Sequence, residues 1–171
     1  LKIGADQGVP IMMETYAILH DLSEESGIPF DKKEAAKYYK MAADHGLEKS
    51  MFYYGKMLCF GDGIPSDIQE SKKYTKMSAD KGFPIAMYIY ALMLIDEDSS
   101  NKEEILKYMK MAADNDVSEA MNKYAYFRLF EEGYEHDLKE AFTYYKKSAE
   151  KGNVTGLYLY SKLLSVDSPF T

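Results

Sequence analysis

The feature that most constrains this chain is a nine-residue stretch that recurs four times at nearly equal spacing. Each copy has a Tyr at its start, two small residues and an acidic residue, and three of the four end in Gly; the copies are residues 38–46, 74–82, 108–116 and 144–152, and residues 4–8 repeat the tail. The last positions, 8, 46, 82, 116 and 152, are 38, 36, 34 and 36 residues apart. Such a period is typical of stacked supersecondary units, so the sequence predicts a repeat array.

Each repeat contains two segments of helical periodicity, which we call A and B. In the A segment after Gly46, the residues Leu47, Met51, Tyr54 and Leu58 recur at intervals of three and four, which predicts one face of a helix. A small residue always stands nine positions after the repeat Gly, and it would let a neighbouring helix approach closely. These small residues are Ala17, Gly55, Ala91, Ala125 and Ser161.

Each B segment begins with a helix-start pattern, an N-cap residue followed three positions later by Glu. The pairs are Asp31–Glu34, Asp67–Glu70, Asn101–Glu104 and Asp137–Glu140. We expect each B helix to end at the repeat Gly in a left-handed conformation, with Asp116 a weaker substitute in one repeat. The order A, loop, B predicts an all-α, right-handed α/α superhelical solenoid of antiparallel helix hairpins, with about 4.5 repeats.

The predicted domain organisation is a single repeat array over residues 1–171. Its repeats are 9–46, 47–82, 83–116 and 117–152, flanked by a partial B helix at 1–8 and a partial A helix at 153–165. A half-hairpin at each end leaves apolar faces uncovered, so we expect some self-association through these uncapped ends.

These motifs resemble a known family. The residues that carry the resemblance are Asp31, Ala35, Tyr38-Tyr39, Ala42-Ala43, Gly46, Tyr54-Gly55, Gly61-Asp62-Gly63-Ile64 and Asp67. The chain resembles the Sel-one-like repeat family, a relative of the tetratricopeptide repeat, over nearly its whole length. It departs from the family pattern in one respect, since Tyr54 stands where Leu is usual and Leu58 where Tyr is usual. The resemblance implies a scaffold or adaptor of multiprotein assemblies.

Composition excludes several classes of function. The net charge of −7 argues against a nucleic-acid surface, which needs clustered Lys and Arg. The longest apolar run, residues 85–95, is too short to cross a bilayer, so no membrane insertion is expected. The single cysteine, Cys59, cannot form an internal disulfide. Nothing therefore requires an oxidising compartment, and we favour a cytoplasmic location.

No catalytic or metal-binding constellation can be assembled from the sequence. The histidines His20, His45 and His136 share no metal-ligand spacing, and we predict that they are solvated. Gly61-Asp62-Gly63 lacks the rest of a phosphate-binding loop and is predicted to be a turn. We therefore predict no catalytic residue, metal or cofactor, and no enzyme activity. Two alternatives stay open: a regulatory or targeting domain of a larger enzyme or signalling protein and, less favoured, hydrolase activity within the solenoid.

The predicted binding surface is the concave A-helix face, by analogy with related solenoids. Residues six and ten positions after the repeat Gly vary while their neighbours repeat, which indicates a surface released from packing. Large aromatics beside amides and lysines suit a peptide or protein ligand. The predicted binding residues are Phe52, Lys56, Tyr88, Leu92, Asn122, Tyr126, Tyr158 and Lys162, and Glu14 and Ile18 share their offsets. The alternative is that Phe52 and Tyr88 only pack adjacent A helices.

Two recurrent sets are assigned to the core rather than to recognition. They are Met13, Met51, Met87 and Met121 of the A segments, and Tyr38, Tyr74, Tyr108 and Tyr144 of the B segments. Acidic clusters fall in or beside the A-to-B loops, at residues 24–25, 96–98 and 131–132. A solvated surface explains them, and a basic partner docking on this acidic edge is the alternative.

Overall fold

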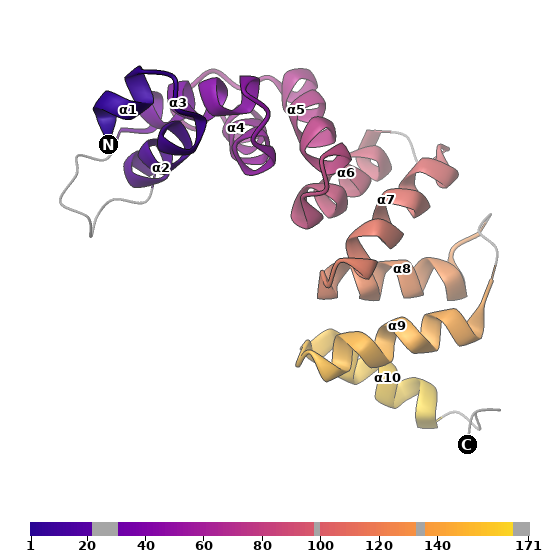
Figure 1. Ribbon diagram of the computed structural model, residues 1–171. Coiled ribbons are helices and arrows are strands. Elements are labelled where there is room, and N and C mark those ends of the chain that lie inside the picture. Colours follow the sequence, from indigo (N-terminus) through magenta and orange to yellow (C-terminus); the bar gives the residue numbers. More distant parts are fainter. Residues whose placement is uncertain (22–30, 98–99, 133–135, 166–171) are drawn as a thin grey trace. The chain divides into compact units, whose positions relative to one another are not determined.

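The computed structural model describes residues 1–21, 31–97, 100–132 and 136–165, and every regular element in these residues is a helix (Figure 1). The helices are α1 (Lys2–Asp6), α2 (Pro10–Asp21), α3 (Lys32–Asp44), α4 (Glu48–Phe60), α5 (Ile68–Asp80), α6 (Pro84–Glu97), α7 (Lys102–Asp114), α8 (Ser118–Phe130), α9 (Leu138–Glu150) and α10 (Val154–Ser165). The predicted all-α fold of helix hairpins is confirmed. The even-numbered helices correspond to the A segments and the odd-numbered helices to the B segments.

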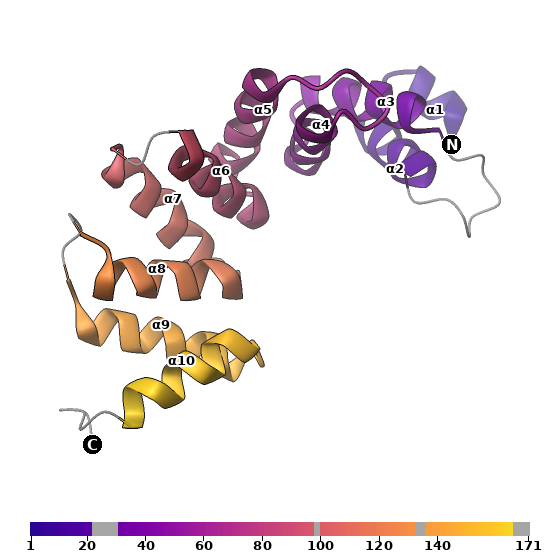
Figure 2. The same ribbon diagram turned by 180° about the vertical axis from the view of Figure 1, so that it is seen from behind.

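The helices form two compact units, Leu1–Ala86 and Met87–Thr171, which are described separately. In the first unit α2 packs on α3, α3 on α4 and α4 on α5. In the second unit α7 packs on α8, α8 on α9 and α9 on α10. The opposite views agree that α8, α9 and α10 lie side by side, with neighbours running in opposite directions (Figures 1 and 2). Each unit is therefore a stack in which a helix contacts mainly its neighbours in sequence.

The predicted helix starts are confirmed at all four B helices. The side chain of each N-cap residue accepts a hydrogen bond from the backbone N–H of the Glu three positions later, which satisfies one of the free amides of the first turn. The N···O distances are 3.0 Å at Asp31, 2.9 Å at Asp67, 3.4 Å at Asn101 and 2.9 Å at Asp137.

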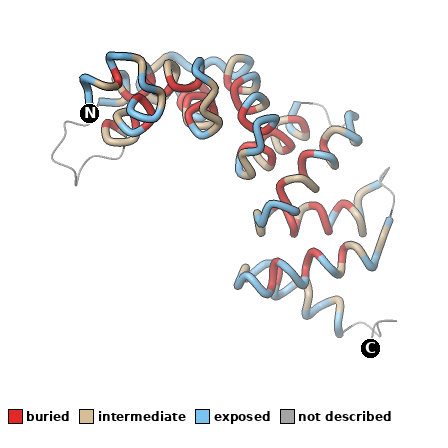
Figure 3. The backbone as a smooth tube through the Cα atoms, in the orientation of Figure 1, coloured by how far each residue is buried: buried red, intermediate tan, exposed pale blue. Residues whose placement is uncertain are grey.

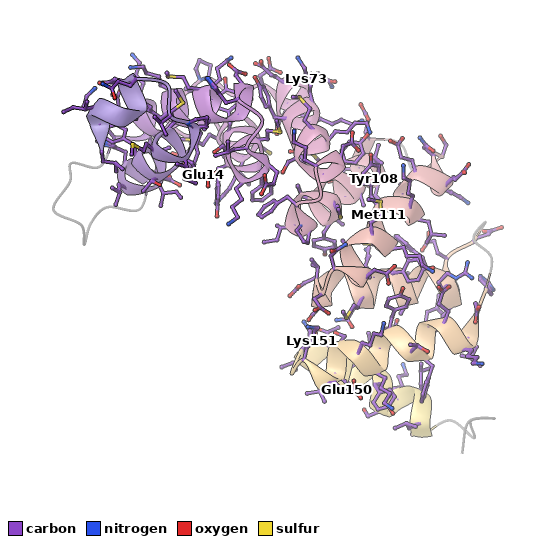
Figure 4. All side chains as sticks on the ribbon, viewed as in Figure 1. Glu14, Lys73, Tyr108, Met111, Glu150 and Lys151 are labelled. Carbon is purple, nitrogen blue, oxygen red and sulfur yellow. The ribbon has the colours of Figure 1, made fainter. Side chains whose placement is uncertain are left out.

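The B helices also end as predicted, with a left-handed residue at each repeat position. Gly46 has φ 92° and Gly82 has φ 97°, a region that glycine enters without a side-chain penalty. Asp116 adopts the same conformation at φ 71°. Its carboxylate lies 3.1 Å from Nζ of Lys151, the residue labelled at the end of α9 in Figure 4.

The core of each hairpin is built on pairs of tyrosines, one from the A helix and one from the B helix. Tyr54 and Tyr74 meet edge to face at 4.8 Å between ring centroids, and Tyr124 and Tyr144 do so at 4.9 Å. This geometry favours aromatic pairs. Equivalent pairs join Tyr16 to Tyr38 and Tyr90 to Tyr108. The pairing gives a physical reason for Tyr at the A-helix position where the family usually has Leu.

The two residue sets assigned to the core are buried, and buried positions lie where the helices of a unit meet (Figure 3). Met51 is 2% exposed and Met121 1%, so the prediction that the recurrent methionines fill the core is confirmed. The small residue at the ninth position is also needed for packing. A Cβ on Gly55 would lie 3.0 Å from Oγ1 of Thr75, so α5 approaches α4 closely there.

A recurring hydrogen bond joins the aspartate that ends one B helix to a tyrosine within the next B helix. The hydroxyl of Tyr74 donates to Asp44 at 3.3 Å, and that of Tyr144 donates to Asp114 at 2.5 Å. Tyr38 makes the same bond to Asp6. These three tyrosines thus pack their rings within one hairpin and bond their hydroxyls to the preceding B helix.

Candidate functional site

The second unit contains a groove formed along the A helices, with residues of α6, α8 and α10 in its walls. Its volume is about 660 Å³. The lining residues are Tyr88 and Ile95 of α6, Glu119, Asn122, Lys123, Tyr126, Phe127 and Glu131 of α8 and its C-terminal end, and Asn153, Thr155 and Leu159 at α10. We call this hollow the α8 groove. Because α8 contributes its first turn, its middle and its end, the groove follows the length of that helix.

A polar chain lies at one end of the α8 groove. Nδ2 of Asn122 donates to Oδ1 of Asn153 at 2.9 Å, and the same Oδ1 accepts the backbone N–H of Gly156 at 3.1 Å. Since Asn153 presents an oxygen, Asn122 must present its amide N–H₂, which fixes the orientation of its side chain. The other end of the Asn122 amide, Oδ1, is buried and has no hydrogen-bond partner among the described residues.

The acceptor is enclosed, because Asn122 is only 8% exposed. Buried amide oxygens are nearly always paired, and leaving one open costs about 1–3 kcal/mol. Glu119 lies one helical turn before Asn122 and accepts a long bond of 3.5 Å from Nδ2 of Asn153. This end of the groove therefore holds two acceptors, the Glu119 carboxylate and the buried, unpaired oxygen of Asn122.

Aromatic rings supply much of the remaining wall. Tyr126 is 43% exposed and lies 5.5 Å from the ring of Phe130 and 6.3 Å from that of Phe127. Burial and the nearby Glu119 carboxylate raise the pKa of the Tyr88 phenol, which therefore stays neutral at physiological pH. The rings give the groove apolar area beside its polar end.

The charges of the α8 groove are unequal. Glu119 and Glu131 stand near opposite ends of α8, about 18 Å apart at the rise of an α-helix. Lys123 lies between them and places its Nζ 5.7 Å from the centroid of the Phe127 ring. Two carboxylates against one ammonium leave the groove with a net negative charge.

A second unpartnered group lies close to the groove. The Tyr145 hydroxyl of α9 is buried and has no hydrogen-bond partner among the described residues. Burial, and then the proximity of Tyr126, raise its pKa to about 12. Leu129 stands on α8 where Asp21 stands on α2, so the second unit lacks at this position the carboxylate whose charge acts on Tyr39 in the first unit.

The structure places the predicted binding residues in different surroundings. Tyr88, Asn122 and Tyr126 are brought together in the α8 groove. Tyr158, 62% exposed, and Lys162 lie on the surface of α10, while Leu92 is half-buried on α6.

The first unit holds the other two predicted residues. Phe52 is half-buried and its ring lies 5.3 Å from that of Phe83, whereas Lys56 is exposed. The sequence predicts that the position six residues after the repeat Gly is free of packing. This prediction is wrong at Glu14 and Asn122, which are each 8% exposed.

Sequence reasoning missed Glu119, Phe127 and Asn153 as groove residues. One signal could have found Asn153. The position directly after the repeat residue is apolar in the other repeats, where it is Val9, Leu47, Phe83 and Val117. Asn153 is the polar exception, and it caps α10 and holds Asn122.

Arg128 shows how a polar residue can replace Leu within the stack. Its Nε lies 2.9 Å from Oε2 of Glu140, and Nζ of Lys110 lies 2.5 Å from Oε1 of the same carboxylate. Burial of Glu140 favours the protonated form. The hydrogen bonds from Lys110 and Tyr124 and the two positive charges outweigh burial and hold the Glu140 pKa below its ordinary value. This cluster joins α7, α8 and α9 and has a structural role.

The structure also bears on the predictions made for the histidines, for metal binding, for membrane insertion and for the acidic clusters of the sequence. His20 was expected to be solvated, but it is 8% exposed and its ring lies 4.5 Å from that of Tyr16, because α2 faces α3 at this position. Within the described ranges, no cluster of His, Cys, Asp and Glu could hold a metal ion, and no helix is long and apolar enough to cross a membrane. Of the acidic clusters, residues 24, 25 and 98 lie outside the described residues.

The Sel1 repeat matches four consecutive segments, residues 18–47, 48–83, 84–117 and 118–153. The chain belongs to the Sel1 repeat family. Sel1 repeat proteins are generally protein-interaction scaffolds without enzymatic activity. No curated protein matches the chain.

Two solved structures share the fold. A Sel1 repeat protein from Oxalobacter formigenes is 28% identical with a TM-score of 0.82, over 94% of this chain and 66% of that one. A protective antigen of uropathogenic Escherichia coli strains, described as displaying an SLR fold, is 21% identical with a TM-score of 0.82, over 96% of this chain and 35% of that one. The Sel1 chain thus spans just under two thirds of the first of these proteins and about a third of the second.

Proposed function

We propose that this Sel1 repeat chain is a non-catalytic scaffold that binds a peptide or protein through its A-helix face. The observation that carries the proposal is the α8 groove, in which the A-helix residues Tyr88, Asn122 and Tyr126 line one hollow. A volume of about 660 Å³ lies within the range of small-molecule sites and accommodates a few side chains of a peptide.

The chemistry of the groove supports a peptide ligand. Tyrosine rings contribute large contact areas with few rotatable bonds, and tyrosine is enriched at binding hot spots. Exposed Tyr158 and Lys162 extend the proposed surface along α10. Phe52, Lys56 and Leu92 complete the proposed set on the other A helices.

The experiment is selection of binders from a random peptide display library on the immobilised chain. Tyr88→Ala with Tyr126→Ala is expected to weaken the selected peptides by about 10- to 100-fold, since aromatic hot spots contribute about 2 kcal/mol or more when truncated. Affinities would be measured by fluorescence anisotropy, and circular dichroism would verify that the variant keeps its helicity.

A matched control comes from the B helices. Lys139→Ala with Lys146→Ala changes two exposed residues of α9 and is expected to leave peptide affinity unchanged. If the α9 control loses the selected peptides while the groove variant keeps them, recognition lies on the B-helix side and the proposal is wrong.

Self-association through the ends remains a prediction. Leu157 of α10 is 49% exposed, whereas Met51 at the same repeat offset is 2% exposed. Exposed apolar surface of this kind favours association. Light scattering over a concentration series tests it, and a constant monomer mass would contradict it.

A further inference from the structure

We infer that the Glu119 end of the α8 groove selects an arginine side chain from an extended segment of the partner protein. The inference rests on the proposed function, because it names the chemistry of the partner for the same groove. It is carried by three observations: an open acceptor, an adjacent carboxylate, and aromatic walls.

The open acceptor is Oδ1 of Asn122. It is held in place because the amide N–H₂ of Asn122 bonds to Asn153, whose own oxygen also caps α10. A side chain that is 8% exposed and lines a groove with an unpaired oxygen is satisfied only by an incoming N–H or O–H donor. A ligand group that reaches this oxygen must therefore be a donor.

The adjacent carboxylate sets the charge of that donor. Glu119 precedes Asn122 by three residues, so both side chains lie on one face of α8. Its contact with Asn153 is long, at 3.5 Å, which leaves most of its hydrogen-bonding capacity available. A cationic donor can pair with Glu119 and reach Asn122, whereas an acidic ligand would be repelled.

The shape and stacking of the site favour arginine over lysine. A guanidinium has five donors in a planar fork, so it can bond a carboxylate and an amide oxygen together. It also stacks on aromatic faces, and Tyr88 stands close enough to Glu119 for the carboxylate to affect its phenol. A lysine ammonium is a point charge with a larger hydration shell and gains less from this arrangement.

The other end of the same groove provides an internal control. Glu131 is also a carboxylate, at the C-terminal end of α8, but it lies about 18 Å from Glu119 and no unpaired amide stands beside it among the described residues. Glu119→Gln and Glu131→Gln remove the same charge from the same groove, and only the first touches the proposed arginine site.

The test is an NMR titration of the 171-residue chain with a capped alanine pentapeptide carrying one central arginine. Its citrulline analogue, which keeps the shape and loses the charge, serves as the second probe. Shifts are expected at residues 119–122 and 153. We expect the citrulline peptide to bind about tenfold more weakly, as for the loss of a charged hydrogen-bonding partner.

The variants complete the test. Glu119→Gln is expected to weaken the arginine peptide about tenfold and Glu131→Gln by less than about twofold, with affinity falling as salt is added. Equal binding of the arginine and citrulline peptides, equal effects of the two variants, or no shift at residues 119–122 at saturating peptide would each overturn the inference.

The two proposals fail in distinguishable ways. If library-selected peptides bind through Tyr88 and Tyr126 but show no arginine enrichment on the parent over Glu119→Gln, only the arginine assignment is wrong. If neither selected peptides nor the arginine peptide bind the groove, the proposed function falls as well.

Discussion

The two units of this Sel1 repeat chain place a buried polar residue at the same repeat offset and satisfy it differently. In the first unit, Glu14 of α2 (labelled in Figure 4) accepts a hydrogen bond of 2.6 Å from the hydroxyl of Ser50. In the second unit, Asn122 of α8 donates to Asn153, and its oxygen is unpaired within the described ranges. The first arrangement gives the buried acceptor a donor within the unit, and the second leaves an acceptor at a groove.

The tyrosine that stands eight positions after the N-cap of a B helix shows a similar contrast between the two units. The negative charge of the Asp21 carboxylate adds to burial in raising the pKa of Tyr39 of α3, and Asp21 lies 2.5 Å from Nζ of Lys32. The hydroxyl of the equivalent Tyr145 has no partner in the part of the chain that the structure describes, and Leu129 stands where Asp21 stands in the first unit. The comparison teaches that equivalent packing does not require equivalent polar satisfaction, and that groups left open mark where a partner could supply the missing bond.

The largest expected effect is alkaline unfolding of both units. Burial is the leading cause that raises the pKa of several core tyrosines above the ordinary 10.0, namely Tyr39, Tyr54, Tyr74, Tyr124, Tyr144 and Tyr145. The unfolded chain loses these protons near pH 10, whereas the folded chain keeps them. The contribution of these tyrosines to stability is therefore fully present below pH 10, and it is lost as the pH rises toward their pKa values in the folded state.

Circular dichroism, followed together with tyrosinate absorbance, measures this transition. Asp21 adds to the effect of burial at Tyr39, so hydrogen exchange should report opening near Tyr145 before opening near Tyr39. Full ionisation of the tyrosines with unchanged helicity would contradict the prediction.

The next largest expected effect is the loss of stability when the hydrogen bond between Ser50 and Glu14 in the first unit is removed. Ser50→Ala removes the donor to the buried Glu14 carboxylate, and we expect a loss of about 1.5–3 kcal/mol in the free energy of unfolding. Asn122→Leu in the second unit removes an already unpaired oxygen and one hydrogen bond. It should cost about 1 kcal/mol or less. Urea denaturation measures both.

A double variant controls the first measurement. Glu14→Leu with Ser50→Ala removes both partners and should be more stable than Ser50→Ala alone, because no buried carboxylate is left without its donor. A double variant less stable than Ser50→Ala alone would contradict this account.

The smallest expected effect on stability is at Tyr39 and Tyr145, which occupy equivalent positions in the two units. Tyr39→Phe removes a hydroxyl that lies near the Asp21 carboxylate and should cost about 1 kcal/mol. Tyr145→Phe removes a buried hydroxyl with no partner among the described residues, and it should be neutral or stabilising by up to about 1 kcal/mol. Thermal unfolding of the two variants compares them directly. Equal destabilisation by both would show that Tyr145 is bonded in solution.

Much of the fold could be predicted because local rules repeat along the chain. Asp67 followed by Glu70 determines a helix start through bonds made within a few residues, and Gly82 ends the helix because it tolerates positive φ. Met51 could be assigned to the core from its recurrence alone. These features depend on neighbours in sequence or on the repeat period.

The candidate site was less predictable because it depends on contacts across helices. The offsets pointed to Tyr88, Asn122 and Tyr126, which line one groove, but they also suggested that Asn122 was free of packing. The contribution of Asn153 arises only when α10 packs beside α8. Phe127 was missed since its apolar character is equally typical of a core residue.

The sequence by itself determined the repeat period, the helix boundaries and the family, because each follows from short-range bonds copied four times along the chain. Only the tertiary structure decided which polar groups find partners. Glu14 accepts a hydrogen bond from Ser50, whereas the Asn122 oxygen and the Tyr145 hydroxyl find no partner among the described residues. The physical reason is that hydrogen-bond satisfaction depends on ångström distances between side chains of different helices, and no residue encodes these distances alone.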